Sequence, residues 1–264
     1  MSYVPNDGII VESDGPVRIV KLNRPESRNA IQQDIKDALL VVWDNIADDL
    51  DVRAVVLTGE GKAFSAGGDI KNFPNVAADP DYRRRHRLRN ARRIIDAMTT
   101  FPLPLVVAVN GPAVGLGCSL AAMGDVVYAA ESAFFADPHV SIGLVAGDGG
   151  AALWPLMMSL VRAKEYIFTG DRITAEEAHR IGLVNHVVPD EELLDRALAM
   201  AHRLAAQPRQ AIQETKKAMN LHIQRAAFGV LDVAMTAESE TFLSDDNQRI
   251  VREFIDRSEQ RGTR

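Results

Sequence analysis

His139 and Asp148 stand nine residues apart in a stretch that is otherwise mostly apolar or glycine. A histidine, whose unperturbed pKa is about 6.5, can accept or deliver a proton near neutral pH. Asp148 falls where the sequence predicts the start of a helix, and the helix dipole favours a carboxylate there. An aspartate beside a histidine fixes its tautomer and stabilises the imidazolium form. The two residues are therefore a candidate acid–base dyad; alternatively, Asp148 only caps the helix and His139 is a satisfied turn residue.

Two glycine-rich loops, Ala66-Gly67-Gly68 and Gly115-Leu116-Gly117, each follow a predicted strand. Glycine lets the backbone approach a ligand closely, and at the second loop the next helix adds the positive end of its dipole. Together such loops can aim two backbone N–H groups at one oxygen, an oxyanion hole suited to the enolate of a thioester. The alternative is that both serve only packing and turn geometry. Neither loop has the pattern of a dinucleotide or phosphate loop.

Alternating strands and helices must position these loops. The predicted elements are a hairpin over Ile9–Leu22, a helix near Ile31–Asp48, strands at Ala54–Thr58, Leu105–Val109, Val126–Ala129, Ala133–Phe135 and Val184–Val188, and helices after each glycine loop region. From Asp190 onward the pattern is helical. We therefore predict an α/β fold, with residues 1–200 as its core and residues 201–264 as a helical C-terminal region.

The composition narrows the function classes. The 264 residues are 47% hydrophobic and 25% charged, with a net charge of -6, which fits a globular protein and disfavours a general nucleic-acid binder. The single cysteine, Cys118, excludes a disulfide framework and is predicted to lie in the core. No zinc-type spacing and no signal peptide is visible, so we expect no metal site and a cytoplasmic location. The uncharged run Ala97–Gly124 contains prolines and glycines that argue against a membrane span.

The sequence around both loops resembles the crotonase superfamily of enoyl-CoA hydratases and isomerases. The resemblance rests on Ala63–Ile70, Asn110–Cys118, Asn23–Ile31, Phe168–Gly170, Ala175–Ala178 and Gly182–Val184, and it spans nearly the whole chain. It implies a spiral of ββα turns whose C-terminal helices, here residues 201–264, build homotrimers and often homohexamers.

The resemblance also implies roles for individual residues. The N–H groups of Ala66 and Leu116 would form the oxyanion hole. Coenzyme A, as part of the substrate and with no separate cofactor, would be held by the loop segments, namely Arg28, Ala30, Ala66, Gly68, Asp69, Ile70 and Gly115.

The sequence departs from the hydratases of this family at their two catalytic glutamates. Ser119 and His139 occupy the matching positions. Serine has no useful basicity near pH 7, so Ser119 can at most position water, and His139 with Asp148 must carry the proton transfers. A His–Asp pair in this setting resembles the 6-oxocamphor-hydrolase branch, which cleaves a carbon–carbon bond of cyclic β-diketones without coenzyme A.

The segment Tyr82–Arg93 carries seven arginines in twelve residues. It can be a solvated helix face, a contact for CoA phosphates or an acidic neighbouring subunit, or an RNA-binding surface. Because few aromatic residues interleave with the arginines, RNA is the least favoured of these partners.

Three functions remain open from the sequence. The first is an enzyme of the hydratase/isomerase family that acts on an acyl-CoA through a stabilised enolate. The second is a β-diketone hydrolase that uses His139 and Asp148. The third is a non-catalytic relative that binds CoA or RNA.

Overall fold

A computed structural model describes residues 6–82 and 88–262 of the chain. Its main sheet has six strands in the order β1-β2-β3-β4-β6-β9. Their bounds are β1 Ile9–Asp14, β2 Val17–Leu22, β3 Ala54–Gly59, β4 Leu105–Val109, β6 Val126–Ala130 and β9 His186–Val188. The hairpin β1–β2 is antiparallel, as predicted, and every other neighbouring pair is parallel, with Val56 opposite Val106 and Val107 opposite Val127.

A second, smaller sheet makes the chain a spiral. It consists of β5 (Ala113–Val114), β7 (Phe134–Ala136) and β8 (Ile173–Thr174). The chain runs from β4 to β5 and then into helix α5 (Leu116–Ala122), and it runs from β6 to β7 before the next helix. This alternation of a strand in each sheet with a helix confirms the predicted ββα spiral.

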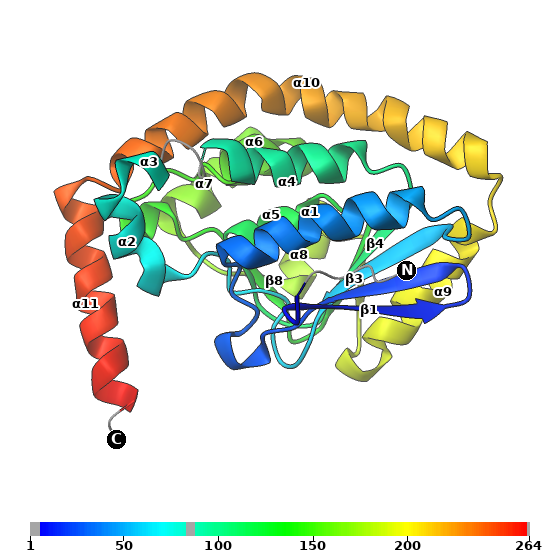
Figure 1. Ribbon diagram of the computed structural model, residues 1–264, viewed down its shortest axis with the longest axis horizontal. Coiled ribbons are helices and arrows are strands. Elements are labelled where there is room, and N and C mark those ends of the chain that lie inside the picture. The colour runs from blue at the N-terminus through cyan, green and yellow to red at the C-terminus, as the bar shows by residue number, and fades with distance from the viewer. Residues whose placement is uncertain (1–5, 83–87, 263–264) are drawn as a thin grey trace.

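Helices cover the main sheet and set the positions of the loops (Figure 1). The α-helices of the core are α1 Gln33–Asp48, α2 Phe73–Ala78, α3 Pro80–Tyr82, α4 Leu88–Thr100, α6 Gly150–Met157, α7 Leu160–Thr169, α8 Ala175–Ile181 and α9 Leu193–Ala205. The 3-10 turns are η1 Pro25–Ser27, η2 Ile70–Asn72, η4 Val140–Ile142 and η5 Asp190–Glu192. Thr174 caps α8 by accepting a hydrogen bond from Glu177 N–H, as its capping-box sequence predicts.

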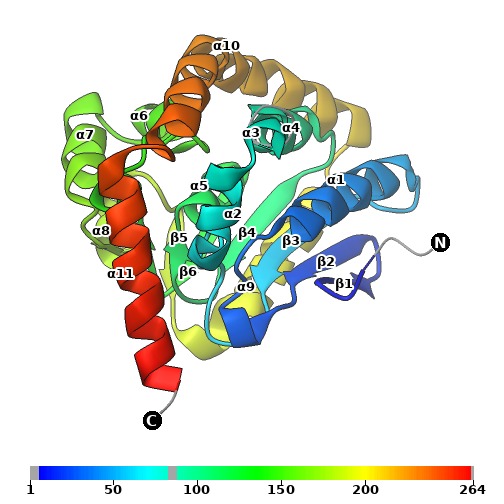
Figure 2. The ribbon, with the colours of Figure 1, turned by 60° about the vertical axis from the view of Figure 1, so that its left-hand side comes forward.

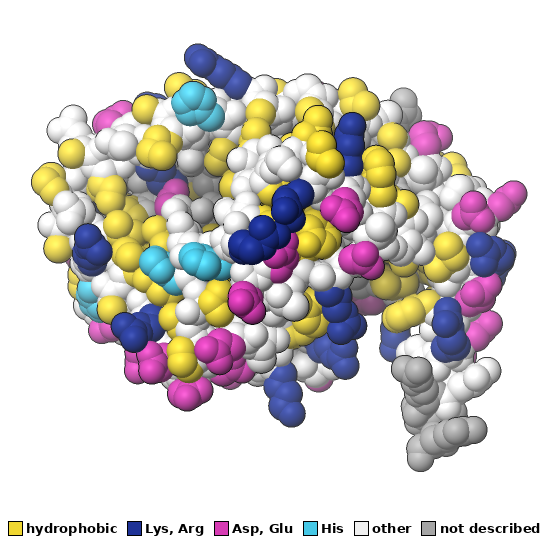
Figure 3. Space-filling view, turned by 180° about the vertical axis from the view of Figure 1, so that it is seen from behind, with side chains coloured by type: hydrophobic (Ala, Val, Ile, Leu, Met, Phe, Trp, Pro, Cys, Tyr) yellow, Lys and Arg dark blue, Asp and Glu magenta, His cyan; other side chains and the backbone are white. Residues whose placement is uncertain are grey.

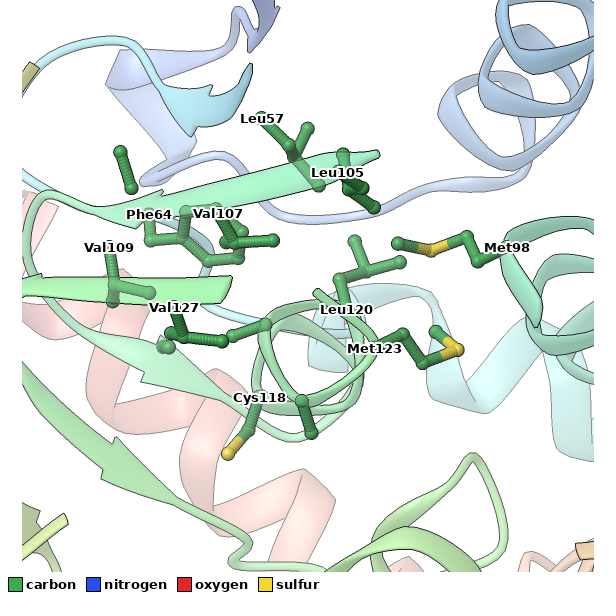
Figure 4. Close-up of a cluster of buried hydrophobic side chains, with 14 of the residues drawn as sticks. Leu57, Phe64, Met98, Leu105, Val107, Val109, Cys118, Leu120, Met123 and Val127 are labelled. Atoms are coloured by element: carbon green, nitrogen blue, oxygen red, sulfur yellow. The ribbon is translucent and has the colours of Figure 1, made fainter. Parts of the chain in front are cut away.

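Helix α5 is buried along its whole length. Leu120 and Met123 point toward Met98 of α4, while Cys118 lies on another side of the helix (Figure 4). Cys118 is free and buried, and burial raises the pKa of its thiol well above the ordinary value, which confirms a core cysteine. The uncharged run Ala97–Gly124 is thus strand, turn and buried helix, and no described helix is long and apolar enough to cross a bilayer.

Two long helices fold back over the core. Helix α10 (Arg209–Thr241) crosses α4 and α6, and α11 (Asp245–Gly262) descends beside α2, η2 and η4 (Figures 1 and 2). The predicted boundary at residue 200 lies inside α9, which packs against β3, β4 and β6. The chain therefore leaves the core only after Ala205, and Pro208 then marks the start of α10.

A buried lysine anchors the first half of α10. Lys216 Nζ donates to Leu103 O at 2.7 Å and to the Asp125 carboxylate at 2.7 Å, and Asp125 also accepts from Leu105 N–H. Burial lowers the pKa of Lys216, while attraction to Asp125 opposes that effect. This end of the helix is thus held beside the start of β4, and the other half of α10 carries Glu238, which lines the cavity described next.

Candidate active site

Asn29 ties the segment before α1 to the first glycine loop. It is buried in a left-handed conformation, with φ 55°. Its Oδ1 accepts from Arg24 N–H at 2.8 Å, and its Nδ2 donates to Ala63 O at 2.8 Å. Its carbonyl accepts from Ser65 Oγ, which in turn accepts from Gly67 N–H. The loop is therefore held by side-chain hydrogen bonds on its inner side.

The two glycine loops pack against each other. Gly67 has φ 79°, and a Cβ at that position would lie 2.4 Å from Val114 O, so only glycine fits. Gly115, with φ 53°, precedes α5, and its N–H donates to Ala136 O at 2.9 Å. These contacts bring Gly68 of the first loop and Leu116 of the second to one cavity.

The backbone donors of the loops differ from the predicted pair. Ala66 N–H donates to Arg28 O at 2.8 Å, which contradicts the prediction that this group is free to hold an oxyanion. Among the described residues, the N–H groups of Gly68 and Leu116 donate no hydrogen bond. Leu116 is the first residue of α5, where helix geometry leaves the N–H without an internal acceptor.

The cavity between the loops measures about 110 Å³. Most of the predicted site residues line it, namely Ala66, Gly68, Asp69, Ile70, Gly115, Leu116, His139 and Asp148. Further lining comes from Ile31, Gln32, Gln33, Lys36, Asn72, Phe73, Val76, Val114, Pro138, Ile142 and Glu238. The structure thus brings both glycine loops and the predicted dyad together.

The predicted coenzyme A residues outside the cavity lie next to its loops. Arg28 is exposed with φ 54° and holds Ala66 through its carbonyl, and Ala30 is half-buried two residues later. Asp69 lines the cavity but has both oxygens occupied: one caps η2 by accepting from Lys71 N–H, and the other accepts from Gln32.

Ser119 does not line the cavity, which corrects its predicted role in positioning water. Its side chain is fully buried, and its Oγ lies 2.5 Å from where a Cβ on Gly149 would stand. Three residues after Leu116 on α5, it faces the start of α6. Its hydroxyl makes no hydrogen bond with the described residues.

His139 lies between two carboxylates. The chain leaves β7 at Ala136, and His139, whose side chain is 9% exposed, follows just before η4. Nδ1 hydrogen-bonds to Asp137 Oδ1, and Nε2 lies 3.5 Å from Asp148 Oδ2. Because a carboxylate accepts, Nδ1 carries a proton in the neutral tautomer and Nε2 has the free lone pair.

Asp137 is the partner that the sequence analysis missed. Its carboxyl is 1% exposed and also accepts from His139 N–H at 3.3 Å. A Cβ on Gly150, the first residue of α6, would fall 1.8 Å from Asp137 Oδ2. Glycine at this position makes room for the carboxylate at the positive end of the helix. The sequence Asp137-Pro138-His139 contained this signal, since an aspartate two residues before a residue commonly accepts its N–H.

Glu238 is a second missed residue and comes from α10. It is 2% exposed and lines the cavity, and its Oε2 lies 2.5 Å from where a Cβ on Gly147 would stand. Gly147 therefore leaves room for this carboxyl beside Asp148. No local pattern predicts this contact, because Glu238 is far along the chain in a long helix.

The carboxylates of Asp137 and Asp148 stabilise the charged form of His139. Burial lowers the pKa of the imidazole, but Asp137 and then Asp148 outweigh it through attraction and hydrogen bonding, so the pKa is raised well above 6.5. The two carboxylates therefore favour the imidazolium form of His139 in the unliganded site, and Nε2 can act as a base only after it has lost its proton. Among the described residues, no group of three or more His, Cys, Asp or Glu is placed to hold a metal ion.

Comparisons with known proteins all point to the same family. Residues 12–261 match the family model for enoyl-CoA hydratase/isomerase. The chain is 33% identical over 252 residues to a short-chain-enoyl-CoA hydratase of Clostridium acetobutylicum, covering 95% of each chain. It is 36% identical over 241 residues to a crotonyl-CoA hydratase of Syntrophomonas wolfei, covering 89% of this chain and 88% of that one.

A solved structure is also similar. The crystal structure of an enoyl-CoA hydratase/isomerase from Mycobacterium paratuberculosis superposes with a TM-score of 0.89 and 46% identity, covering 94% of this chain and 98% of that chain. This match confirms the fold that the sequence resemblance predicts.

The charge assignment can be tested by following the imidazole signals of His139 by NMR against pH. We expect a midpoint above 6.5 in the wild type and a lower midpoint in Asp137→Asn and in Asp148→Asn, because each change removes an anion that stabilises imidazolium. Asp137→Asn should have the larger effect. Asp171→Asn, an exposed change outside the cavity, is the control and should leave the midpoint unchanged. A midpoint unmoved by both cavity variants would contradict the assignment.

Proposed function

The chain belongs to the enoyl-CoA hydratase/isomerase family, and we propose that it binds an acyl-CoA thioester and stabilises the enolate of that thioester above His139. One observation supports this most: Gly68 and Leu116, whose backbone N–H groups donate no hydrogen bond among the described residues, line the same small cavity as His139. N–H pairs of this kind stabilise negative charge on a carbonyl oxygen as it develops.

In this proposal, Gly68 takes the place predicted for Ala66 as the first oxyanion donor. Leu116 remains the second donor, and the dipole of α5 adds to its N–H. The acyl carbonyl lies between them, and coenzyme A extends past the backbone of Arg28 and Ala30. No cofactor beyond the CoA of the substrate is required.

His139 performs the proton transfers alone in this site. As imidazole, Nε2 takes a proton from the α-carbon or from water; as imidazolium, it returns the proton to the α-carbon of the enolate. Asp137 keeps the proton on Nδ1, so that the reactive lone pair stays on Nε2. Asp148 lies beside Nε2 and Glu238 lines the same cavity, and these carboxyl groups can hold a water or a substrate hydroxyl.

Hydrolysis of a β-diketone is the second candidate. The flanking carboxylates favour it, because a histidine between acids can activate water for attack on a carbonyl. The oxyanion donors would then hold the enolate that leaves when the carbon–carbon bond breaks. The two candidates share the same residues and differ in whether the substrate carries coenzyme A.

Three reactions distinguish them: α-hydrogen exchange of butyryl-CoA in D2O, hydration of crotonyl-CoA, and hydrolysis of a cyclic β-diketone. We expect exchange on the CoA thioester, at a rate that rises with pH through a midpoint above 6.5 because Nε2 must lose its proton. His139→Ala should lower the rate of this exchange by a factor of about 10²–10⁴.

Asp148→Asn should shift the same profile to lower pH. Ser119→Ala is the matched control and should keep the wild-type rate, since Ser119 faces α6. Activity on the diketone alone would instead establish the second candidate, and exchange that survives His139→Ala would contradict the role of the histidine.

The oxyanion hole can be tested at Leu116, because proline is tolerated at the first position of a helix. Leu116→Pro deletes the N–H and should lower kcat by about 10²–10³. Leu116→Ala removes the same side chain but keeps the donor, so it should retain most of the activity. Equal losses in both variants would assign the effect to the side chain and contradict the proposed donor.

We also propose that the protein assembles as a homotrimer or homohexamer. Several large apolar side chains of α7 and α10 are exposed, including Val161 at 77%, Phe168 at 64% and Val233 at 72%. On the rear face, apolar side chains lie between mixed acidic and basic ones (Figure 3). Burial of such side chains favours association. Residues 83–87 of the arginine-rich segment Tyr82–Arg93 lie outside the described residues. Light scattering should give the mass of three or six chains, and a monomer at micromolar concentration would contradict this assembly.

A further inference from the structure

We infer that Phe73 is the end wall of the acyl site and restricts the substrate to short acyl chains. The inference rests on the proposed acyl-CoA function and names its substrate class. It comes from a second cavity, a groove between α2 and α11, that shares Phe73 with the active-site cavity.

The active-site cavity has an apolar end. Its charged and polar groups include His139 and Asp148, whereas Ile70, Val76 and Ile142 line it with hydrocarbon. These three residues belong to or pack against a satellite hydrophobic cluster that is separate from the main core. The alkyl tail of a thioester held by Gly68 and Leu116 has this apolar surface available to it.

Phe73 closes the apolar end. The residue is 8% exposed, and its ring lies 3.7 Å from where a Cβ on Gly68 would stand, directly beside the proposed oxyanion donor. The ring also packs edge-on against Phe242 at the end of α10, with centroids 5.1 Å apart. Contacts on both sides fix the ring in place, because buried aromatic pairs of this geometry are favourable.

The groove behind Phe73 is larger than the cavity in front of it. It measures about 310 Å³ against about 110 Å³, and small or apolar side chains form much of it, including Ala77, Ala78 and Val251. Removal of the Phe73 ring would join the two spaces. A long acyl chain would then pass from the oxyanion site into the groove, and each methylene buried there raises affinity about fourfold.

The test is the binding of saturated acyl-CoAs that cannot be hydrated, measured by isothermal titration calorimetry with acetyl-, butyryl-, octanoyl- and dodecanoyl-CoA. In the wild type, we expect the affinity to rise up to butyryl-CoA and to fall for the two longer thioesters. In Phe73→Ala, dodecanoyl-CoA should bind at least about tenfold more tightly than it does to the wild type. Butyryl-CoA should change by less than about threefold.

Two further variants control for effects on the fold. Val251→Ala enlarges the groove but leaves the wall, so it should keep the wild-type dependence on chain length. Phe73→Leu leaves part of the wall and should give an intermediate dependence, even if Phe73→Ala proves too unstable to purify.

The outcomes separate this inference from the proposed function. If no acyl-CoA binds the wild type, both the proposed function and the inference fail. If short acyl-CoAs bind but the two Phe73 variants keep the wild-type dependence on chain length, the proposed function holds and Phe73 is not the end wall of the acyl site. Tight binding of dodecanoyl-CoA to the wild type would also contradict the inference that Phe73 restricts the length of the acyl chain.

Discussion

A buried hydrogen bond between Asp137 and Nδ1 of His139 determines which nitrogen can do chemistry in this protein. It keeps a proton on Nδ1 in both charge states, so that Nε2 is the nitrogen that can release and take up a proton. The bond requires β7 to end at Ala136 and α6 to begin with a glycine, because any side chain at Gly150 would collide with the carboxylate. The placement of the imidazole beside Asp137 therefore depends on the local backbone as much as on the histidine.

The carboxyl groups near His139 must be held in place by the fold, because the burial of a charged group costs free energy unless the group is paired or hydrogen-bonded. Gly147 makes room for the carboxyl group of Glu238, which belongs to α10 and lines the cavity. The anchor in the other half of α10, Lys216, is itself buried and bonded to Leu103 O and Asp125. Two carboxyl side chains, those of Asp137 and Asp148, thus interact with the imidazole and raise its pKa. The third, that of Glu238, lines the same cavity.

The sequence predicted the elements well and the site in part. Apolar patterns and turn residues are local signals, so the hairpin, the alternation of strands and helices and the helical end could be read directly, whereas the ββα spiral was implied only by the family resemblance. His139, Asp148 and Leu116 were found because they stand in motifs of a family. Ser119 was expected in the site, but the direction of its side chain depends on how α5 packs against α6. Ala66 was expected as an oxyanion donor, but its N–H donates a hydrogen bond to the carbonyl oxygen of Arg28, a contact that no local pattern shows. Glu238 could not be predicted, since only tertiary packing brings α10 to the cavity.

We propose that Nε2 of His139 faces an acyl group whose carbonyl is held by Gly68 and Leu116. A crystal structure of the protein with acetoacetyl-CoA tests this arrangement directly. We expect the thioester oxygen at about 2.7–3.1 Å from both backbone nitrogens. We also expect Nε2 within about 3.5 Å of the α-carbon or of a bound water. A carbonyl bound elsewhere, or an imidazole whose Nε2 is turned away from the ligand, would contradict it.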